Sequence, residues 1–471
     1  MLGAHAQVLM VSSRPRRAIP LCENAISIAR SVGARAEEAY ALEILAGSLD
    51  DLGDLDRAIA LHLEARRLAE EVGDADTVVR TYVNLGAALS LAGRDREALD
   101  DSREGYRRAR ELGLERAGGS FVASNLAWQL LCSGRWDECD RLTTHVLAGD
   151  AWNIFGALAA QGRLLTWRGD FTAARQRLER AVQLSPSALG NDARLTLAEL
   201  DLWEGDHDAA ATEIAAGLRW CAENDPEGIL HHHSSPWYPL ALRLEADRAE
   251  RAAAARAPNE VAGARRRATA VIAQLDRLVA DRTPQARFPE VVCHLALAQA
   301  ERSRLEGTSD PERWHTAQLA WERLERPFEA AYAGFRRAES LLTSGAPGPQ
   351  AEEALRAAHQ TATTLGAAPL RREIELLARR GRLRLTEPAR APKGAPSFSS
   401  PMESFGLTRR ETQVLVLVTE GRTNRQIGRE LFITEKTASL HVSRILAKLG
   451  VASRVEAAAV AHRLGLSGSD G

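Results

Sequence analysis

Residues 53–73 read GDLDRAIALHLEARRLAEEVG, and residues 93–113 read GRDREALDDSREGYRRARELG. Both stretches begin with a glycine followed by a charged residue, and both end in a glycine. Small residues at matching places in residues 13–33 extend this period to a third copy. The recurring residues are Ala18, Ala58 and Ala98; Ala29, Ala69 and Ala109; and Gly33, Gly73 and Gly113. Self-similarity at a fixed period of this length is the signature of a repeat architecture.

Within residues 53–73 the apolar residues follow the periodicity of a helix. A helix over residues 56–72 places a stripe at i, i+3 and i+4 spacing against a neighbouring helix. The stripe consists of Ala58, Leu61, Ala65, Leu68 and Ala69. Its small side chains let two helices approach closely, and one helix pair cannot bury its apolar face alone. The sequence therefore predicts an all-α fold in which helix pairs stack into a superhelix.

The turn before the second helix of each pair recurs along the chain, with looser spacing after the third copy. The turns are Ser13-Arg14, Gly53-Asp54, Gly93-Arg94, Gly134-Arg135, Gly169-Asp170 and Gly205-Asp206. This pattern resembles tetratricopeptide-type repeats, whose usual period of about 34 residues is shorter than the one seen here. Helices are expected to about Leu385, and residues 225–310 fit the repeat least well. Residues 1–385 are predicted to form a sensor or interaction domain whose concave surface suits a peptide, a partner protein or an effector.

The tryptophans, histidines and cysteines of this region have structural interpretations. Packing between helices explains the tryptophans better than a ligand groove does; they are Trp128, Trp136, Trp152, Trp167, Trp203, Trp220 and Trp237. His231, His232 and His233 fit a polar loop before Pro236 better than a metal site, because no acidic or Cys partner stands at ligand spacing. The cysteines lack metal-binding spacing and predict buried free thiols. No metal or cofactor is expected.

The composition changes after residue 385. Residues 386–404 read TEPARAPKGAPSFSSPMES, which is rich in Pro and Ser and has no helical periodicity, so a flexible linker is predicted. Residues 405–471 carry ten Lys/Arg and six Asp/Glu, a net charge of +4, whereas the whole chain has a net charge of −2. A basic end on an acidic body indicates a nucleic-acid partner for that end only.

Residues 405–468 are predicted to form a domain of four short helices, at 409–419, 424–431, 435–449 and 454–464. Capping boxes mark three helix starts, and glycines mark three helix ends. The caps are Thr408, Thr423 and Ser453, and the glycines are Gly421, Gly450 and Gly465. Only residues 432–434 separate the second helix from the third, so these two helices must cross steeply. This is the helix-turn-helix arrangement, in which the second member of the pair lies in the major groove of DNA.

Apolar residues define the core of this domain and leave one face of helix 435–449 to solvent. The predicted core is Leu407, Val414, Leu415, Val418, Ile427, Leu431, Val442, Ile445 and Leu449. The opposite face of helix 435–449 consists of Lys436, Ser439, Leu440, Ser443, Arg444, Ala447 and Lys448. That face is basic and small, as a surface that meets phosphates and base edges is.

The stretch LTRRETQVLVLVTEGRTNRQIGRELFITEKTASLHVSRILAKLGVASRVEAAAVAHRLGL, residues 407–466, resembles the LuxR-type helix-turn-helix at the end of many bacterial regulators. The resemblance implies that one set of residues in the third helix approaches DNA and that Thr423 and Asn424 lie near the DNA backbone. The set is Lys436, Thr437, Ser439, Leu440, Arg444 and Lys448. It also implies dimerisation through the last helix, in which small residues permit close contact. Those residues are Ala457, Ala458 and Ala461.

The chain departs from that family at three positions. Members often carry Val where this chain has Ala438, and a basic residue followed by a polar one where it has Ser439 and Leu440. Because the last two positions are expected to read bases, an operator sequence does not transfer to this chain; Leu440 instead suits a thymine methyl group.

The order of repeat region and terminal domain resembles the C-terminal part of large LuxR regulators that carry an ATPase module. No GxxxxGK[ST] phosphate loop occurs in the sequence, so nucleotide switching is not predicted and the chain is interpreted as a shortened relative or a fragment. The first ten residues lack the features of a signal peptide, and no apolar run is long enough to span a membrane. A cytoplasmic protein is therefore expected.

The predicted function is a transcriptional regulator that binds double-stranded DNA with helix 435–449 and is controlled by an effector or partner bound to the repeats. The main alternative is an interaction scaffold whose terminal bundle is not a sequence-specific DNA reader. A receiver-type regulator would need alternating strands and helices, which the helical pattern contradicts. No enzymatic activity is predicted, because HExxH, a nucleophile elbow and a convincing acid/base pair are all missing from the sequence.

Overall fold

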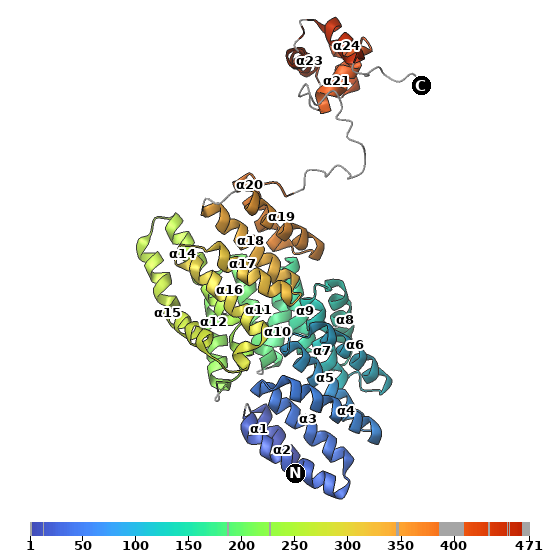
Figure 1. The fold of residues 1–471 in the computed structure, drawn as a ribbon, viewed down its shortest axis with the longest axis vertical. Coiled ribbons are helices and arrows are strands. Elements are labelled where there is room, and N and C mark those ends of the chain that lie inside the picture. Colours follow the sequence, from blue (N-terminus) through green and yellow to red (C-terminus); the bar gives the residue numbers. More distant parts are fainter. Residues whose placement is uncertain are drawn as a thin grey trace. The chain divides into compact units, whose positions relative to one another are not determined.

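The computed structural model describes residues 2–12, 14–185, 188–225, 228–344, 348–385, 409–431, 434–449, 451 and 453–463. The chain forms two compact units, Met1–Glu387 and Pro388–Gly471 (Figure 1). Every regular element in the described ranges is a helix, which confirms the all-α prediction. The predicted linker, residues 386–404, lies outside the described residues.

The first unit begins with a series of helices joined by short turns, each packed on the next. They are α1 (Leu2–Val11), α2 (Pro15–Val32), α3 (Arg35–Leu52), α4 (Leu55–Val72), α5 (Ala75–Leu91), α6 (Asp95–Glu111), α7 (Gly118–Cys132), α8 (Trp136–Ala148), α9 (Phe155–Arg168), α10 (Phe171–Leu184), α11 (Ala188–Glu204) and α12 (His207–Asn224). The second part of this unit contains α13 (His231–Ser234), α14 (Trp237–Ala254), α15 (Pro258–Ala280), the 3-10 turn η1 (Gln285–Arg287), α16 (Pro289–Leu305), α17 (Pro311–Arg323), α18 (Pro327–Thr343), α19 (Gly348–Leu365) and α20 (Ala368–Gly381).

Glycines in the left-handed region of the backbone produce the repeat period. Gly93 has a φ of 71° and Gly134 a φ of 77°, and the other predicted turn glycines share this conformation. After such a turn the amide of Arg94 donates to the carbonyl of Leu89, 2.8 Å away, which satisfies the end of the preceding helix. Because a β-carbon disfavours this conformation, glycine adopts it at the lowest cost. One period is therefore two helices and two turns. Ser13 lies outside the described residues.

Helix α4 buries the predicted stripe, Ile59 beside it, and one polar residue that the pattern did not single out. Ala58, Ala65, Leu68 and Ala69 are buried, and Leu61 is partly buried. The unexpected residue is His62, which has no solvent exposure.

The side chain of His62 lies between two carboxylates of α3. Its Nδ1 is 2.8 Å from Glu43 Oε2, and its Nε2 is 2.9 Å from Asp50 Oδ2. Glu43 also accepts a hydrogen bond from Asn84 Nδ2 of α5 at 2.8 Å. Burial disfavours the charged imidazole, but the charges of Glu43 and Asp50 and their hydrogen bonds outweigh it and raise the pKa of His62 to about 10. A buried charged triad thus joins α3 and α4, and the hydrogen bond from Asn84 links it to α5.

The second part of the unit folds back onto the first along a seam of glycines and prolines. Three glycine turns of the early helices each meet a proline at the start of a later helix. The pairs are Gly93 with Pro289, Gly134 with Pro327, and Gly169 with Pro369. A β-carbon at Gly93 would lie 2.9 Å from Pro289 Cγ, which is closer than real side chains approach. Hydrogen bonds accompany the seam, from Gln285 Nε2 to the carbonyl of Asp51 at 3.2 Å and from Arg326 Nη2 to Asp95 Oδ1 at 3.1 Å.

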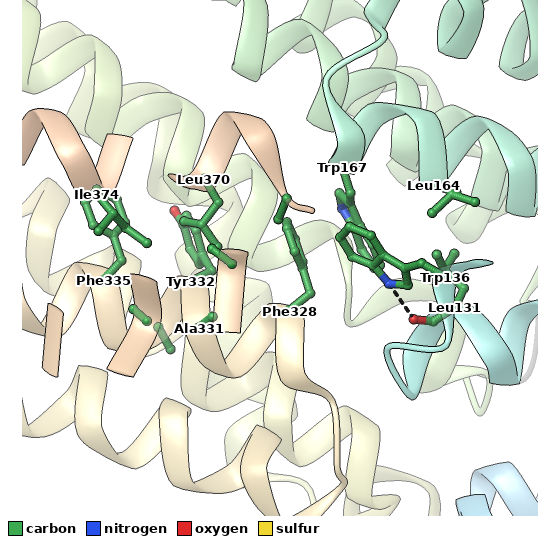
Figure 2. Close-up of a cluster of buried hydrophobic side chains, with 14 of the residues drawn as sticks. Leu131, Trp136, Leu164, Trp167, Phe328, Ala331, Tyr332, Phe335, Leu370 and Ile374 are labelled. Atoms are coloured by element: carbon green, nitrogen blue, oxygen red, sulfur yellow. Dashed lines mark hydrogen bonds between the residues drawn. The ribbon is translucent and has the colours of Figure 1, made fainter. Parts of the chain in front are cut away.

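An aromatic stack forms the centre of the largest buried cluster at this junction (Figure 2). Trp167 of α9 lies over Phe328 of α18, with ring centroids 4.1 Å apart and planes inclined by 20°. Trp136 of α8 stacks on Trp167 at 5.6 Å and donates its Nε1 hydrogen to the carbonyl of Leu131, 3.1 Å away. The predicted concave surface is therefore not an open groove, because α16, α18 and α20 cover part of it.

Other predictions for this unit have mixed outcomes. All five cysteines are free and buried, as predicted. Trp136, Trp167 and Trp237 are buried in helix packing, but Trp152 is 82% exposed. The prediction of a loop at residues 231–233 is wrong: they form the short helix α13, which packs on α12, α16 and η1. Within the described ranges, no helix has both the length and the apolar character that crossing a bilayer demands.

The second unit contains α21 (Arg409–Thr419), α22 (Asn424–Glu430), α23 (Glu435–Leu449) and α24 (Arg454–Arg463). These bounds agree with the predicted helices to within one residue at each end. Helices α21, α23 and α24 pack on one another, and α22 packs on α23.

Replacing His62 with Leu should destabilise the first unit by about 3–5 kcal/mol, because it leaves Glu43 and Asp50 buried without their cation. Urea unfolding of the full chain, followed by circular dichroism, measures the loss. Since the pKa of His62 is raised in the folded protein, the contribution is present at neutral pH and disappears as the pH rises through about 10. Leu63→Ala on the same helix is the control, because Leu63 is 49% exposed. Equal midpoints for the wild type and the His62 variant at pH 7 would contradict this assignment.

Candidate nucleic-acid interface and interior cavity

The second and third helices of the C-terminal unit are joined as a helix-turn-helix requires. Thr423 caps α22: its hydroxyl accepts from the backbone amide of Gln426 at 3.3 Å, and the Gln426 side chain accepts from the Thr423 amide at 2.8 Å. This is the predicted capping box. Helix α22 ends at Glu430 and α23 begins at Glu435, so four residues separate them. The predicted cap at Thr408 and the turn residues 432 and 433 lie outside the described residues.

The core that holds these helices agrees with the predicted one and contains further small residues. Val414, Leu415, Val418, Ile427, Ile445 and Leu449 are buried, and Leu431 and Val442 are partly buried against them. Leu407 lies outside the described residues. Ala438 has no exposure and belongs to this core. Its burial explains why an apolar residue is needed at this position of α23.

The surface of α23 includes part of the predicted DNA-reading face. Ser439 and Ser443 are exposed and stand one helical turn apart, so they share a face. Lys436, Thr437, Leu440 and Arg444 belong to α23, but their side chains lie outside the described residues. Those four positions therefore remain predictions from the sequence.

The start of α22 is tied to the start of α24. Thr423 is exposed, whereas Asn424 is partly buried and its Oδ1 accepts a hydrogen bond from Arg454 Nη1 at 3.1 Å. The Arg454 guanidinium also donates to the backbone carbonyl of Arg422. Asn424 thus has a partner within the protein, a role that the sequence did not reveal.

Lys448, a predicted DNA contact, forms an ion pair inside the unit. Its Nζ lies 2.6 Å from Oε2 of Glu411, and the Glu411 side chain is only 4% exposed, whereas that of Lys448 is 35% exposed. The pair links the last turn of α23 to α21. Lys448 therefore stabilises the domain, and its contact with DNA stays a prediction.

The last helix corrects one expectation about dimerisation. Ala457 and Ala461 are buried in the core of their own unit, where α24 packs on α21, so they do not face a second copy. A small-residue stripe permits close packing on any helix, and in this chain the neighbour is α21. The exposed side of α24 presents Val455, which is 78% exposed, and Ala459.

A cavity of about 250 Å³ lies inside the first unit. Residues from α5, α7, α9, α11, α13, α14, α16, α17 and α18 line it, so helices of both parts of the unit form its wall. The Trp167–Phe328 stack borders it, and Tyr332 one turn further along α18 also lines it (Figure 2). The fold-back of α16 and α18 onto the repeats therefore creates this space.

Polar groups of the cavity wall come from positions that sequence reasoning missed. Its carboxylates are Asp192, Glu199, Glu290, Glu301 and Glu329. Trp128 and Trp167 are among the residues that line the cavity. A tryptophan of this unit can therefore pack between helices and also face the cavity. Among the described residues, no His, Cys, Asp or Glu group has the arrangement of a metal site. The periodicity of a single helix could not identify these carboxylates as one group, because they are spread over α11, α16 and α18.

Comparison with known proteins agrees with both units. Residues 406–461 match the model of bacterial regulatory proteins of the luxR family, and residues 37–111 match a tetratricopeptide repeat model. The chain is 54% identical over 63 residues to the transcriptional regulatory protein LiaR of Bacillus subtilis, covering 13% of this chain and 29% of that protein. It is 44% identical over 72 residues to the DNA-binding transcriptional activator DevR/DosR of Mycobacterium tuberculosis, covering 15% and 32%. It is 46% identical over 57 residues to the nitrate/nitrite response regulator NarL of Escherichia coli, covering 12% and 26%.

Fold and surface thus define a helical-repeat protein with a terminal helix-turn-helix domain. The terminal domain belongs to the LuxR family of DNA-binding regulators, and the N-terminal region contains tetratricopeptide-like repeats. The chain spans about a third or less of the length of the relatives named above. A crystal structure of BtubC (BKLC) from P. vanneervenii matches 45% of this chain and 92% of that chain, with a TM-score of 0.37 and 19% identity.

Replacing Lys448 with Met should lower the stability of the C-terminal unit by about 1–2 kcal/mol, because it removes the ammonium beside buried Glu411. This is less than for a fully buried pair, since solvent screens Lys448. Scanning calorimetry of the full chain measures the effect. Arg429→Met removes an exposed charge from α22 and should change stability by less than about 0.5 kcal/mol. Equal stability of the two variants would show that the ion pair contributes nothing.

Proposed function

We propose that the protein is a transcriptional regulator that inserts α23 into the major groove of double-stranded DNA. The observation that carries this proposal is the helix-turn-helix of α22 and α23, with its capping box at Thr423 and its buried apolar core. In this geometry the second helix meets base edges while the first crosses the DNA backbone. Regulation, and not catalysis, is the activity proposed, and it places the protein in the cytoplasm of a bacterium.

The proposed contacts divide into two groups. Lys436 and Arg444 meet phosphates or guanine edges, and Ser439, Ser443, Thr437 and Leu440 meet base edges and thymine methyl groups. Thr423 and Asn424 bring the N-terminus of α22 to a backbone phosphate, where the helix dipole favours negative charge. Lys448 contributes a third positive charge while it pairs with Glu411.

Dimerisation on a two-fold operator is part of the proposal, but its surface differs from the one expected. Since Ala457 and Ala461 are interior, the exposed side of α24 at Val455 and Ala459 is the contact proposed between two copies. Val455 supports this assignment, because a large apolar side chain that is 78% exposed gains free energy when a partner covers it.

We further propose that the first unit receives an effector that controls the DNA-binding unit. The cavity supports this idea, because a space of about 250 Å³ with aromatic walls and several polar groups is typical of a small-molecule site. The alternative is an interaction scaffold, in which the repeats bind a partner protein and the terminal unit does not read DNA. The LuxR-family match at residues 406–461 favours the regulator.

The test is enrichment of genomic DNA fragments by the full chain at two salt concentrations. The wild type should enrich a small set of fragments, and raising the salt should weaken binding, because phosphate contacts release counterions. Arg444→Ala should reduce affinity by about tenfold, equivalent to the loss of about 1–3 kcal/mol at a base or phosphate contact. Arg379→Ala, which removes an exposed charge from α20, is the control.

If the folded chain enriches no DNA fragments at low salt, the result favours the alternative function, an interaction scaffold. Enrichment that is identical for the wild type and the Arg444 variant would instead remove α23 as the reading helix.

A further inference from the structure

Three carboxylates of the cavity form no ion pair and accept no hydrogen bond from the side chain of another residue within the described ranges. They are Asp192 on α11, Glu290 on α16 and Glu329 on α18. The Oε2 atom of Glu329 is buried and receives no hydrogen bond. Burial raises the pKa of Asp192 to about 6 and that of Glu329 to about 7. Because an unpaired buried carboxylate costs stability, such groups in a cavity are better explained by a ligand than by the fold.

The other two carboxylates of the wall are already occupied. Glu199 accepts a hydrogen bond from Trp167 Nε1 at 3.0 Å. Glu301 accepts from the Tyr332 hydroxyl at 2.6 Å and from Arg304 Nη1 at 2.6 Å. Glu199 and Glu301 therefore have hydrogen-bond partners within the protein, as carboxylates that support the fold do, whereas the other three carboxylates of the wall differ from them.

The positive charges of Arg163 and Arg326 partly offset the effect of burial on the pKa of Glu329, and that of Arg163 does so for Asp192, but both arginines form their ion pairs elsewhere. Arg163 lies 3.8 Å from Glu199 and 4.9 Å from the centre of the Trp128 ring. Arg326 pairs with Asp95 at the seam. A second arginine of the wall, Arg243, lies over the Trp203 and Tyr332 rings. None of these guanidinium groups is hydrogen-bonded or ion-paired to the three carboxylates within the described ranges.

The cavity histidines do not supply the missing positive charge. Burial lowers the pKa of His233 and of His294 to about 4 and places that of His232 well below its usual value. All three are therefore neutral at pH 7. The wall holds five carboxyl groups and two guanidinium groups, so its acidic side chains outnumber its basic ones.

Aromatic rings form the rest of the wall. They belong to Trp128, Trp167, Trp321, Phe328 and Tyr332. The face of an aromatic ring attracts a cation, and the rings also bury apolar surface. Trp321 of α17 is 1% exposed, and its Nε1 hydrogen has no acceptor. This N–H group can donate a hydrogen bond to a polar atom of a ligand.

We propose that the cavity binds a small organic cation, an amine with an apolar or aromatic body. Its ammonium lies among Asp192, Glu290 and Glu329 and pairs with this group of carboxylates, and its body lies against the tryptophan and phenylalanine rings. An organic anion would instead add to the negative charge of the wall. The volume of about 250 Å³ selects a small molecule over a peptide. The binding of the amine to the cavity does not depend on the proposed function, whereas its role as the effector of the regulator rests on that function.

Isothermal titration of the full chain tests the proposal with four probes: phenethylamine, choline, spermidine and phenylacetate. Phenethylamine and phenylacetate share the aromatic body and differ in the sign of their charge. We expect phenethylamine to bind and phenylacetate not to bind. Glu329→Gln and Asp192→Asn should each weaken phenethylamine binding about tenfold or more, because a hydrogen bond to a charged group is lost. Glu373→Gln, an exposed position on α20, should bind like the wild type.

Thermal unfolding separates loss of a ligand group from loss of the fold. Both cavity variants should unfold at the same temperature as the wild type or higher, because an amide in place of an unpaired acid carries a smaller desolvation cost. The proposal is overturned if no cation binds at millimolar concentration, if phenylacetate binds as tightly as phenethylamine, or if the cavity variants bind phenethylamine like the wild type. Fragment enrichment is a separate readout: its failure rejects the regulator, whereas failure of amine binding rejects only this inference.

Discussion

The stack of Trp136, Trp167 and Phe328 joins the two parts of the first unit, and the shape of that unit depends on it. Without the return of α18 onto α8 and α9, the helical repeats would present an open inner surface. With it, α16 and α18 close over that surface and create the cavity. The rings are buried and closely spaced, so the contribution of the stack comes from buried area and ring contact. The glycine and proline seam allows this closure, because a side chain at Gly93 or Gly134 would keep the later helices away.

Buried charge is used in two different ways within the same unit. At His62, two carboxylates pair with one imidazole and join α3 to α4, and Asn84 of α5 donates to Glu43. Around the cavity, Asp192, Glu290 and Glu329 form no ion pair with a side chain of the described residues. The first arrangement stabilises the fold, whereas the second costs stability. Carboxylates with raised pKa values in a cavity mark a candidate functional site.

Local structure could be predicted from the sequence because it depends on near neighbours. The turn glycines, the α4 stripe and all four helices of the terminal unit follow from patterns within about twenty residues. The packing of η1 and of the helices after it onto the early helices could not be predicted. The hydrogen bond from Gln285 to Asp51, for example, joins residues far apart in the sequence. The sequence pattern did not single out His62, because its partners Glu43 and Asp50 stand on another helix. Ala457 and Ala461 were expected in a dimer contact, and the packing of α24 against α21 places them in the core of their own unit.

The helix-turn-helix was predicted from the sequence, its DNA contacts stay a prediction, and the partners of its side chains within the protein were not predicted. Thr423 and the exposed serines of α23 stand where the sequence placed them, but the pairing of Lys448 with Glu411 and of Asn424 with Arg454 required three-dimensional proximity. The most direct test of the whole account is the affinity of the full chain for an enriched DNA fragment with and without saturating phenethylamine. The account predicts that the Kd changes by about fivefold or more with the amine and not with phenylacetate. An unchanged Kd, with the amine shown to occupy the cavity, would contradict control of the DNA-binding unit by the repeats.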